Sequence, residues 1–309
     1  MIEAILVYGA ISGTMYALLA LGFTLIYGVS GVINLAHGSL FMLGTYLFFA
    51  LTVRSFELWL LPAIILAAFF VAIVGSIVYR VTIHPVVKDQ LSVMVVTISL
   101  AIIFQQLMIL GFTSNRQAVL SLGGELARIL GVKELVILWG VKLTYSQILA
   151  SVVSITLFAI LMIFITKTKI GRAMKAISQD REVAMLMGIN TERLCMLTMA
   201  ISASLAAVAG VLIRSIAGVT DPSVWVHPLY MSFAVVILGG LGSIKGSLIG
   251  GLIIGYVENT FVFAIDPLIA SILNLPKGGT LSGAVIMLTV LLVLLIRPKG
   301  LFGKRIELE

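Results

Sequence analysis

Residues 229–263 read LYMSFAVVILGGLGSIKGSLIGGLIIGYVENTFVF, an apolar run in which glycines and Lys245 gather at the centre. At about 1.5 Å per residue, a single helix of this length would measure over about 50 Å. The hydrocarbon core of a membrane is about 30 Å thick, and about 20 residues cross it. We therefore expect a break within Ile237–Gly251. Irregular backbone at membrane depth is tolerated only where protein or a water-filled cavity satisfies it.

The composition of the whole chain has the same character. Of 309 residues, 61% are hydrophobic and 11% are charged, and the mean hydropathy is +1.19. No ordinary soluble domain has such a composition. The sequence predicts an all-α, polytopic helical membrane protein with about eight transmembrane segments, forming a single transmembrane domain over residues 1–309. The expected segments are 4–28, 36–53, 58–79, 91–112, 146–166, 195–217, 229–263 and 279–296.

Charge predicts the orientation of these segments. The net charge is +7, and the basic residues occur in short loops rather than in a nucleic-acid-binding patch. The positive-inside rule places the basic loop 167–194 and the tail in the cytoplasm. The tail carries Arg297, Lys299, Lys304 and Arg305. Alternation of the spans then places residues 80–90 inside and residues 113–145 outside.

A second interruption lies in residues 27–44, YGVSGVINLAHGSLFMLG. Its His37-Gly38-Ser39-Leu40 matches Lys245-Gly246-Ser247-Leu248, and each is followed by an apolar helix. Interrupted helices in two halves of a transporter indicate an internal repeat with the pathway at its interface. A chance match of four positions is the alternative.

The two interruptions supply the candidate pathway residues. A helix that begins at Ser39 or Ser247 directs backbone N–H groups at an anionic group such as a carboxylate. Helix packing by small residues is the competing interpretation of the glycines. Glu258 is a further candidate because a carboxylate is costly inside a membrane, although it could also lie near the outer end. The candidates are Asn34, His37, Gly38, Ser39, Gly240, Gly242, Ser243, Gly246, Ser247 and Glu258.

Enzyme signatures are absent from the sequence. It contains no GxxxxGK[ST] phosphate loop, no HExxH, no GxSxG and no Cys/His metal spacing. Cys195 is the single cysteine, which excludes an internal disulfide. We expect no catalytic residue, no metal site and no hydrolysis of ATP by this chain alone.

The basic loop carries a more specific pattern. Two sets of apolar and small residues recur at i, i+3 and i+4, which predicts short helices across the cytoplasmic face. The sets are Ala173, Ala176 and Ile177, and then Ala184, Met187 and Gly188. Glu182-Val183-Ala184, three residues and Gly188 are similar to the E-A-A-x-x-x-G loop by which permeases of ABC importers dock on their ATPase; Val183 departs from that motif. The resemblance implies docking residues Gly171, Arg172, Ala173, Arg181, Glu182, Ala184, Gly188 and Asn190.

The longer context resembles the LivH-type permease subunit of branched-chain amino acid ABC importers over nearly the whole chain. The motifs are INLAHGSLFMLGTYL, TKTKIGRAMKAISQDREVAMLMGIN, VVILGGLGSIKGSLIGGLIIG and LLIRPKGLFG, in this order. The resemblance implies a multi-pass protein of the bacterial inner membrane. Its implied partners are a second, LivM-like permease, two ATP-binding subunits that hold ATP and magnesium, a periplasmic substrate-binding protein and membrane lipid. This chain itself would bind no cofactor.

The implied function is translocation of branched-chain, neutral aliphatic amino acids. Two alternatives concern the solute, since similar permeases carry urea or short amides. A third is an ion-coupled secondary transporter, which the interrupted helices and Glu258 would also fit. A passive channel for small neutral solutes would require a narrow pore lined by fixed polar groups. Neither of the last two explains the docking motif.

Overall fold

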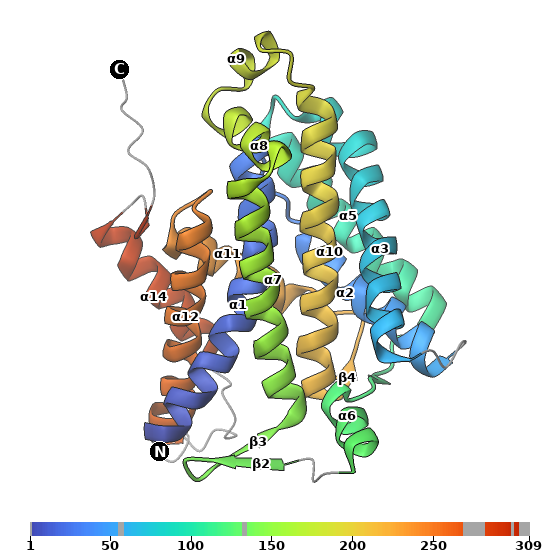
Figure 1. The fold of residues 1–309 in the computed structure, drawn as a ribbon, viewed down its shortest axis with the longest axis vertical. Helices are drawn as coiled ribbons and strands as arrows, with labels where there is room; N and C mark the ends of the chain where they lie inside the picture. Colours follow the sequence, from blue (N-terminus) through green and yellow to red (C-terminus); the bar gives the residue numbers. More distant parts are fainter. Residues whose placement is uncertain (1, 55–58, 132–134, 268–281, 298–299, 303–309) are drawn as a thin grey trace.

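A computed structural model describes residues 2–54, 59–131, 135–267, 282–297 and 300–302. The described chain is a bundle of helices with two small antiparallel ribbons at one end (Figure 1). Among the described residues, six helices are long and apolar enough to cross a membrane. The predicted polytopic helical architecture is therefore confirmed. Lys299, Lys304, Arg305 and residues 279–281 lie outside the described residues.

The long helices are joined by shorter apolar ones. The long helices are α1 (Ile2–Ser30), α3 (Leu60–Val78), α5 (Gln90–Phe112), α7 (Tyr145–Lys167), α10 (Thr191–Ala217) and α12 (Ile244–Thr260). The shorter ones are α2 (His37–Phe49), α11 (Val226–Gly239) and α14 (Ser282–Ile296). The expected break in 229–263 is confirmed, because α11 ends at Gly239 and α12 begins at Ile244. The break in 27–44 is also confirmed, between α1 and α2.

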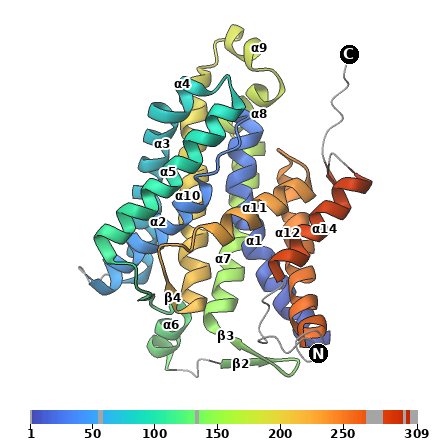
Figure 2. The ribbon, with the colours of Figure 1, turned by 180° about the vertical axis from the view of Figure 1, so that it is seen from behind.

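The two ends of the bundle differ in structure. The basic end carries α4 (His84–Val86), α8 (Lys169–Gln179) and α9 (Arg181–Leu186) (Figures 1 and 2). The ribbon end carries the N-terminus and α6 (Leu122–Leu130). It also carries the two ribbons, β1 (Gln117–Ala118) with β4 (Val219–Thr220) and β2 (Leu135–Leu138) with β3 (Val141–Thr144). Residues 80–90 and the described parts of residues 113–145 thus lie at opposite ends, as the alternation of spans predicted.

The bundle contains an inverted repeat. Helix α1 runs from the ribbon end to the basic end, and α10 runs in the opposite direction (Figure 1). The corners that follow these two helices begin in the same way. Gly31 and Gly218 both have a φ of 70°, which a glycine adopts without steric cost. Three residues later, Asn34 Oδ1 accepts from the N–H of Ala36 at 3.0 Å, and Asp221 Oδ1 accepts from the N–H of Ser223 at 3.0 Å.

Packing follows the same symmetry. The short helices α2 and α11 follow the two corners, α3 packs on α10, and α12 packs on α1. Both α3 and α12 end in a π-helical turn, η2 (Tyr79–Ile83) and η3 (Phe261–Ile265). The repeat therefore pairs α1, α2, α3 and α5 with α10, α11, α12 and α14, and α6 to α9 lie between the two halves.

This register differs from the one predicted. His37 begins the short helix α2 inside the bundle, whereas Lys245 lies in the first turn of the long helix α12 at the basic end. The match of His37–Leu40 with Lys245–Leu248 is therefore wrong, and the equivalent segments are Gly31–Ala36 and Gly218–Trp225. The true correspondence is hard to see in the sequence, because only Gly-Val and the Asn/Asp position agree.

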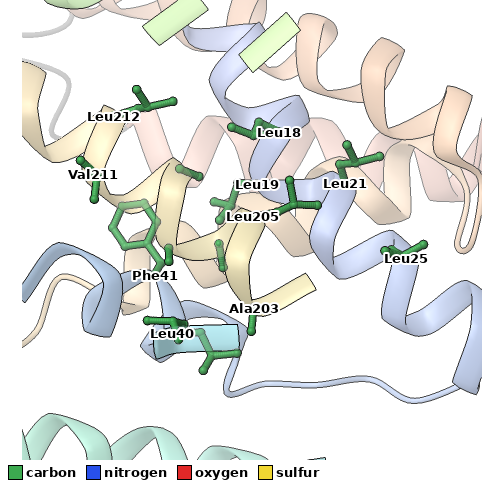
Figure 3. Close-up of a cluster of buried hydrophobic side chains, with 14 of the residues drawn as sticks. Leu18, Leu19, Leu21, Leu25, Leu40, Phe41, Ala203, Leu205, Val211 and Leu212 are labelled. Atoms are coloured by element: carbon green, nitrogen blue, oxygen red, sulfur yellow. The ribbon is translucent and has the colours of Figure 1, made fainter. Parts of the chain in front are cut away.

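The core forms where α2 crosses α1 and α10. Leucines of α1 face Leu40 and Phe41 of α2 and Ala203 and Leu205 of α10 (Figure 3). A Cβ on Gly210 of α10 would lie 2.4 Å from the carbonyl oxygen of Phe41, and one on Gly38 would lie 2.3 Å from that of Trp225. The starts of α2 and α11 therefore touch inside the bundle. These glycines hold the backbones together, as small residues do in membrane helices.

The contact at Gly210 predicts a stability difference. Gly210→Ala should destabilise the protein by about 1–3 kcal/mol, because the new methyl group forces α2 and α10 apart. Gly111→Ala in α5 is the matched control, since its Cβ would meet no atom within 4 Å. Thermal unfolding of both purified variants in detergent checks this. Equal melting temperatures for the two variants would contradict it.

Candidate docking and translocation site

Helix α8 lies across the basic end of the bundle. It turns back sharply from α7 at Gly171, where a Cβ would lie 2.4 Å from the Cα of Ile165. The Thr168 hydroxyl caps its first turn by accepting from the N–H of Gly171 at 3.0 Å. Met174 and Ile177 are buried together with Gly171. One face of α8 therefore packs on the bundle, and the other faces outward.

Helix α9 projects from this end (Figure 1). Asp180 Oδ1 caps it by accepting from the N–H groups of Glu182 at 2.8 Å and Val183 at 2.9 Å. Gly188 ends the turn with a φ of +81°, and Asn190 Oδ1 caps α10 by accepting from the N–H of Arg193 at 3.0 Å. Local capping thus holds a short helix away from the bundle, with few contacts to it.

The apolar face of α9 points outward. Val183, Leu186 and Met187 are 53%, 86% and 78% exposed, whereas Ala184 is buried. These three residues, called here the α9 tip, share one helix face at i, i+3 and i+4. An exposed apolar patch of this kind indicates a surface that binds a partner protein. The predicted face began at Ala184, one residue later; the same spacing counted from Val183 gives the three exposed residues, and this was the signal that was missed.

The remaining predicted docking residues lie on α8, on α9 and in the turn before α10. Arg172, Glu182, Gly188 and Asn190 are exposed, Ala173 and Arg181 are half-buried, and Gly171 is buried. Arg172, Glu182 and Asn190 therefore present charged and polar side chains to the surface of the basic end. The buried Gly171 allows α8 to turn back against α7 and is not available to a partner.

Two adjoining cavities lie beside α8 at the basic end, each about 470 Å³ in volume. Both are lined by Gly28 of α1, Ser178 of α8, and Gly242 and Ser243 of the turn between α11 and α12. Lys175 and Lys245 add positive charge to one cavity and Arg181 adds it to the other, and no Asp or Glu lines either. The basic loop 167–194 and the second break are far apart in sequence, but both line these two cationic cavities.

The turn between α11 and α12 is held tightly. Gly240 and Gly242 have φ values of 98° and 79°, and the Ser243 hydroxyl accepts from the N–H of Gly246 at 3.1 Å. A Cβ on Gly246 would lie 2.2 Å from the carbonyl oxygen of Gly239, so the two helix ends touch. The hydroxyls of Thr24 and Ser247 lie 2.6 Å apart and join α12 to α1.

The last described residues also close this turn. The N–H groups of Leu301 and Phe302 donate to the carbonyls of Leu238 at 2.9 Å and Gly239 at 3.1 Å. These carbonyls lie at the end of α11, where a helix has no partner of its own for them. Phe302 lines one of the two cavities. The tail therefore completes the wall of the site.

The first break reaches these cavities only through residues 27–31, and its predicted pathway residues lie elsewhere. Asn34, His37 and Ser39 are fully buried. His37 Nε2 lies 3.0 Å from the carbonyl oxygen of Leu19, and the Ser39 hydroxyl donates to that of Ala36 at 2.8 Å. Gly38 packs on the carbonyl of Trp225. The structure thus separates the two groups of predicted pathway residues, with one at the cavity and one in the packed core.

Glu258 lies apart from both of these groups of residues. The Tyr16 hydroxyl donates to Glu258 Oε2 at 2.7 Å. Glu258 lies in the last turn of α12, and its neighbour Asn259 donates to the Ser12 hydroxyl at 3.2 Å, which places Glu258 toward the ribbon end. It lines neither cavity at the basic end. Within the described ranges, no group of three His, Cys, Asp or Glu side chains could hold a metal ion.

The conformation of Gly188 generates a prediction about the loop. Gly188→Val should strain the turn after α9 by about 1–2 kcal/mol, because a β-branched residue disfavours positive φ. Gly188→Asn is the matched control, since asparagine tolerates this conformation. The Val variant should therefore be cut faster by protease within residues 180–190 than the Asn variant. Equal cleavage rates would show that the turn carries no such strain.

Comparison with known proteins places the chain in a family. The family model described as branched-chain amino acid transport system / permease component matches residues 5–296. The high-affinity branched-chain amino acid transport system permease protein BraD of Pseudomonas aeruginosa is 34% identical, over 97% of this chain and 95% of that protein. LivH of Salmonella typhimurium, which carries the same description, is 35% identical, over 96% of this chain and 94% of that protein.

The similarity extends to archaea. The probable branched-chain amino acid transport permease protein LivH of Methanocaldococcus jannaschii is 32% identical, over 97% of this chain and 93% of that protein. No solved structure matches the chain. The match covers both halves of the inverted repeat, the α9 tip and the cavity. The chain therefore belongs to the permease component family of branched-chain amino acid transport systems.

Proposed function

We propose that this chain is the membrane-spanning permease subunit of an ATP-driven ABC importer for branched-chain, neutral aliphatic amino acids. The observation that carries the proposal is the full-length similarity to permeases named for this transport. The basic end faces the cytoplasm of a bacterial inner membrane, in accord with the positive-inside rule. A periplasmic binding protein delivers the amino acid to the ribbon end.

The α9 tip is the contact for an ATP-binding subunit. ATP and magnesium bind to two such partner subunits, and a second, LivM-like permease completes the membrane part. Helix α8 follows α7 directly, precedes α9 and forms one wall of the cationic cavity. A displacement of α9 by the ATPase would therefore move that wall relative to the turn between α11 and α12. Loop motions of this kind are a general means of gating.

The alternative solutes, urea and short amides, would use the same subunits and the same docking surface. The ion-coupled alternative instead requires a titrating group on the route. Its candidate, Glu258, is hydrogen-bonded to Tyr16 away from the cavity, which favours a structural role.

The decisive experiment is reconstitution. The chain is expressed with its neighbouring genes, purified by an affinity tag and placed in liposomes with binding protein. Co-purification of ATPase subunits, and ATP hydrolysis stimulated by binding protein with leucine, would support the proposal. Replacing leucine by valine, urea or acetamide ranks the solutes. Solute uptake by the chain alone, without ATPase, would overturn it.

The α9 tip predicts a separable defect. Leu186→Glu should lower ATPase co-purification at least about tenfold, because a buried charge without a partner costs more than the lost apolar contact. Leu186→Met, which keeps an apolar side chain, should co-purify like the wild type. Quantified subunit ratios after size-exclusion chromatography measure the effect. Normal ratios for the Glu variant would remove the tip from the interface.

Glu258 provides a test between the two modes of energising transport. Glu258→Gln keeps an oxygen that can accept from Tyr16 but cannot titrate. ATP-driven uptake should therefore stay within about twofold of wild type. Loss of uptake in this variant, with normal expression and assembly, would favour ion coupling.

A further inference from the structure

A polar cluster lies at the ribbon end, where three elements meet. It consists of Tyr46 of α2, Arg214 of α10, and Thr220 and Asp221 of the corner after α10, and is called here the corner cluster. Tyr46 and Thr220 have no exposed surface. Asp221 and Tyr46 both lie close enough to Arg214 to interact with it electrostatically. The exposed Arg116 adds a further positive charge nearby.

The corner cluster has unmet hydrogen-bonding capacity. The Tyr46 hydroxyl, the Arg214 Nε and the Thr220 hydroxyl are buried and have no hydrogen-bond partner. Most buried polar groups in proteins are paired, and each one left unpaired costs about 1–3 kcal/mol. Three such groups from α2, α10 and β4 in one place indicate a site that something else completes.

The two opposite charges of the cluster are also not joined to each other. Arg214 Nη2 donates to the carbonyl of Val219, and Asp221 Oδ1 accepts from the N–H of Ser223. Between residues that the structure describes, the single ion pair within 4.0 Å is Arg128 with Glu125. A cation and an anion are therefore held near each other but apart.

The inverted repeat supplies an internal control. Tyr27 occupies the position of Arg214, four residues before the corner glycine, and Ile33 and Asn34 occupy those of Thr220 and Asp221. The first corner makes the same Asx turn with these uncharged residues. The charges of the second corner are thus not needed to make the turn, and their position at the ribbon end calls for another role.

We propose that the corner cluster binds the charged backbone of an α-amino acid at the ribbon end of the permease. Arg214 and the hydroxyls of Tyr46 and Thr220 hold the carboxylate, and Asp221 holds the ammonium group. A guanidinium and hydroxyl donors suit a carboxylate, and a carboxylate suits an ammonium group. This inference rests on the proposed function and adds the site that receives the amino acid.

The test uses substitutions that leave the fold alone. Tyr46→Phe and Thr220→Val remove unpaired hydroxyls and keep the shape, so the melting temperature should stay the same or rise. Leucine uptake by the complete transporter in liposomes, with binding protein and ATP, should fall about tenfold, the effect of losing a hydrogen bond to a charged group. Arg128→Gln, an exposed arginine at the same end, is the control and should transport normally.

Ligand chemistry gives an independent measurement. Leucine should raise the melting temperature of the purified transporter without binding protein, whereas 4-methylpentanoate and 3-methylbutylamine, which lack the ammonium group and the carboxylate, should not. Arg214→Gln should abolish the leucine effect. A shift caused equally by urea or acetamide would overturn the assignment to a zwitterion.

The outcomes separate the two proposals. If the wild type shows no ATP-driven uptake, the proposed function fails. If the wild type transports leucine and the Tyr46→Phe and Thr220→Val variants transport it equally well, the corner cluster is merely filled by water and this inference fails.

Discussion

Inside hydrocarbon, each backbone N–H and C=O needs a partner from the protein, because lipid offers none. A continuous helix meets this demand alone, but a chain that stops and restarts within the bundle does not. Here both corners are closed locally, by a glycine of positive φ and an Asx turn. Each short helix that follows packs on the long helix of the other half, α2 on α10 and α11 on α1. The whole bundle therefore depends on how the backbone N–H and C=O groups of these two corners find hydrogen-bond partners.

The same constraint explains the shape of the site at the basic end. The turn between α11 and α12 keeps its hydrogen bonds through Ser243 and through the tail, and it remains beside a cavity instead of being packed away. Helix α8 borders the same cavity and leads into the projecting α9. Helix α8 thus connects the exposed α9 tip with the cavity.

Sequence alone predicted the features that depend on length and composition. The run 229–263 is too long for one span, and its glycines mark the break that the structure places between Gly239 and Ile244. It could not predict that Asn34 and His37 are packed in the core, because their burial depends on α1, α10 and α11 rather than on local sequence. The register of the repeat was missed for a related reason, since equivalent corners share backbone conformation while most of their side chains differ. In α9 the helical period was right, but the face was displaced by one residue.

The contact of the tail with α11 has a consequence for biosynthesis. The carbonyls of Leu238 and Gly239 emerge from the ribosome long before Leu301 and Phe302, which supply their N–H partners. During that interval the end of α11 is open and one wall of the cavity lacks Phe302. A chain truncated before Gly300 retains every described membrane helix but never closes this turn. This turn can therefore close only after all the described membrane helices have been synthesised.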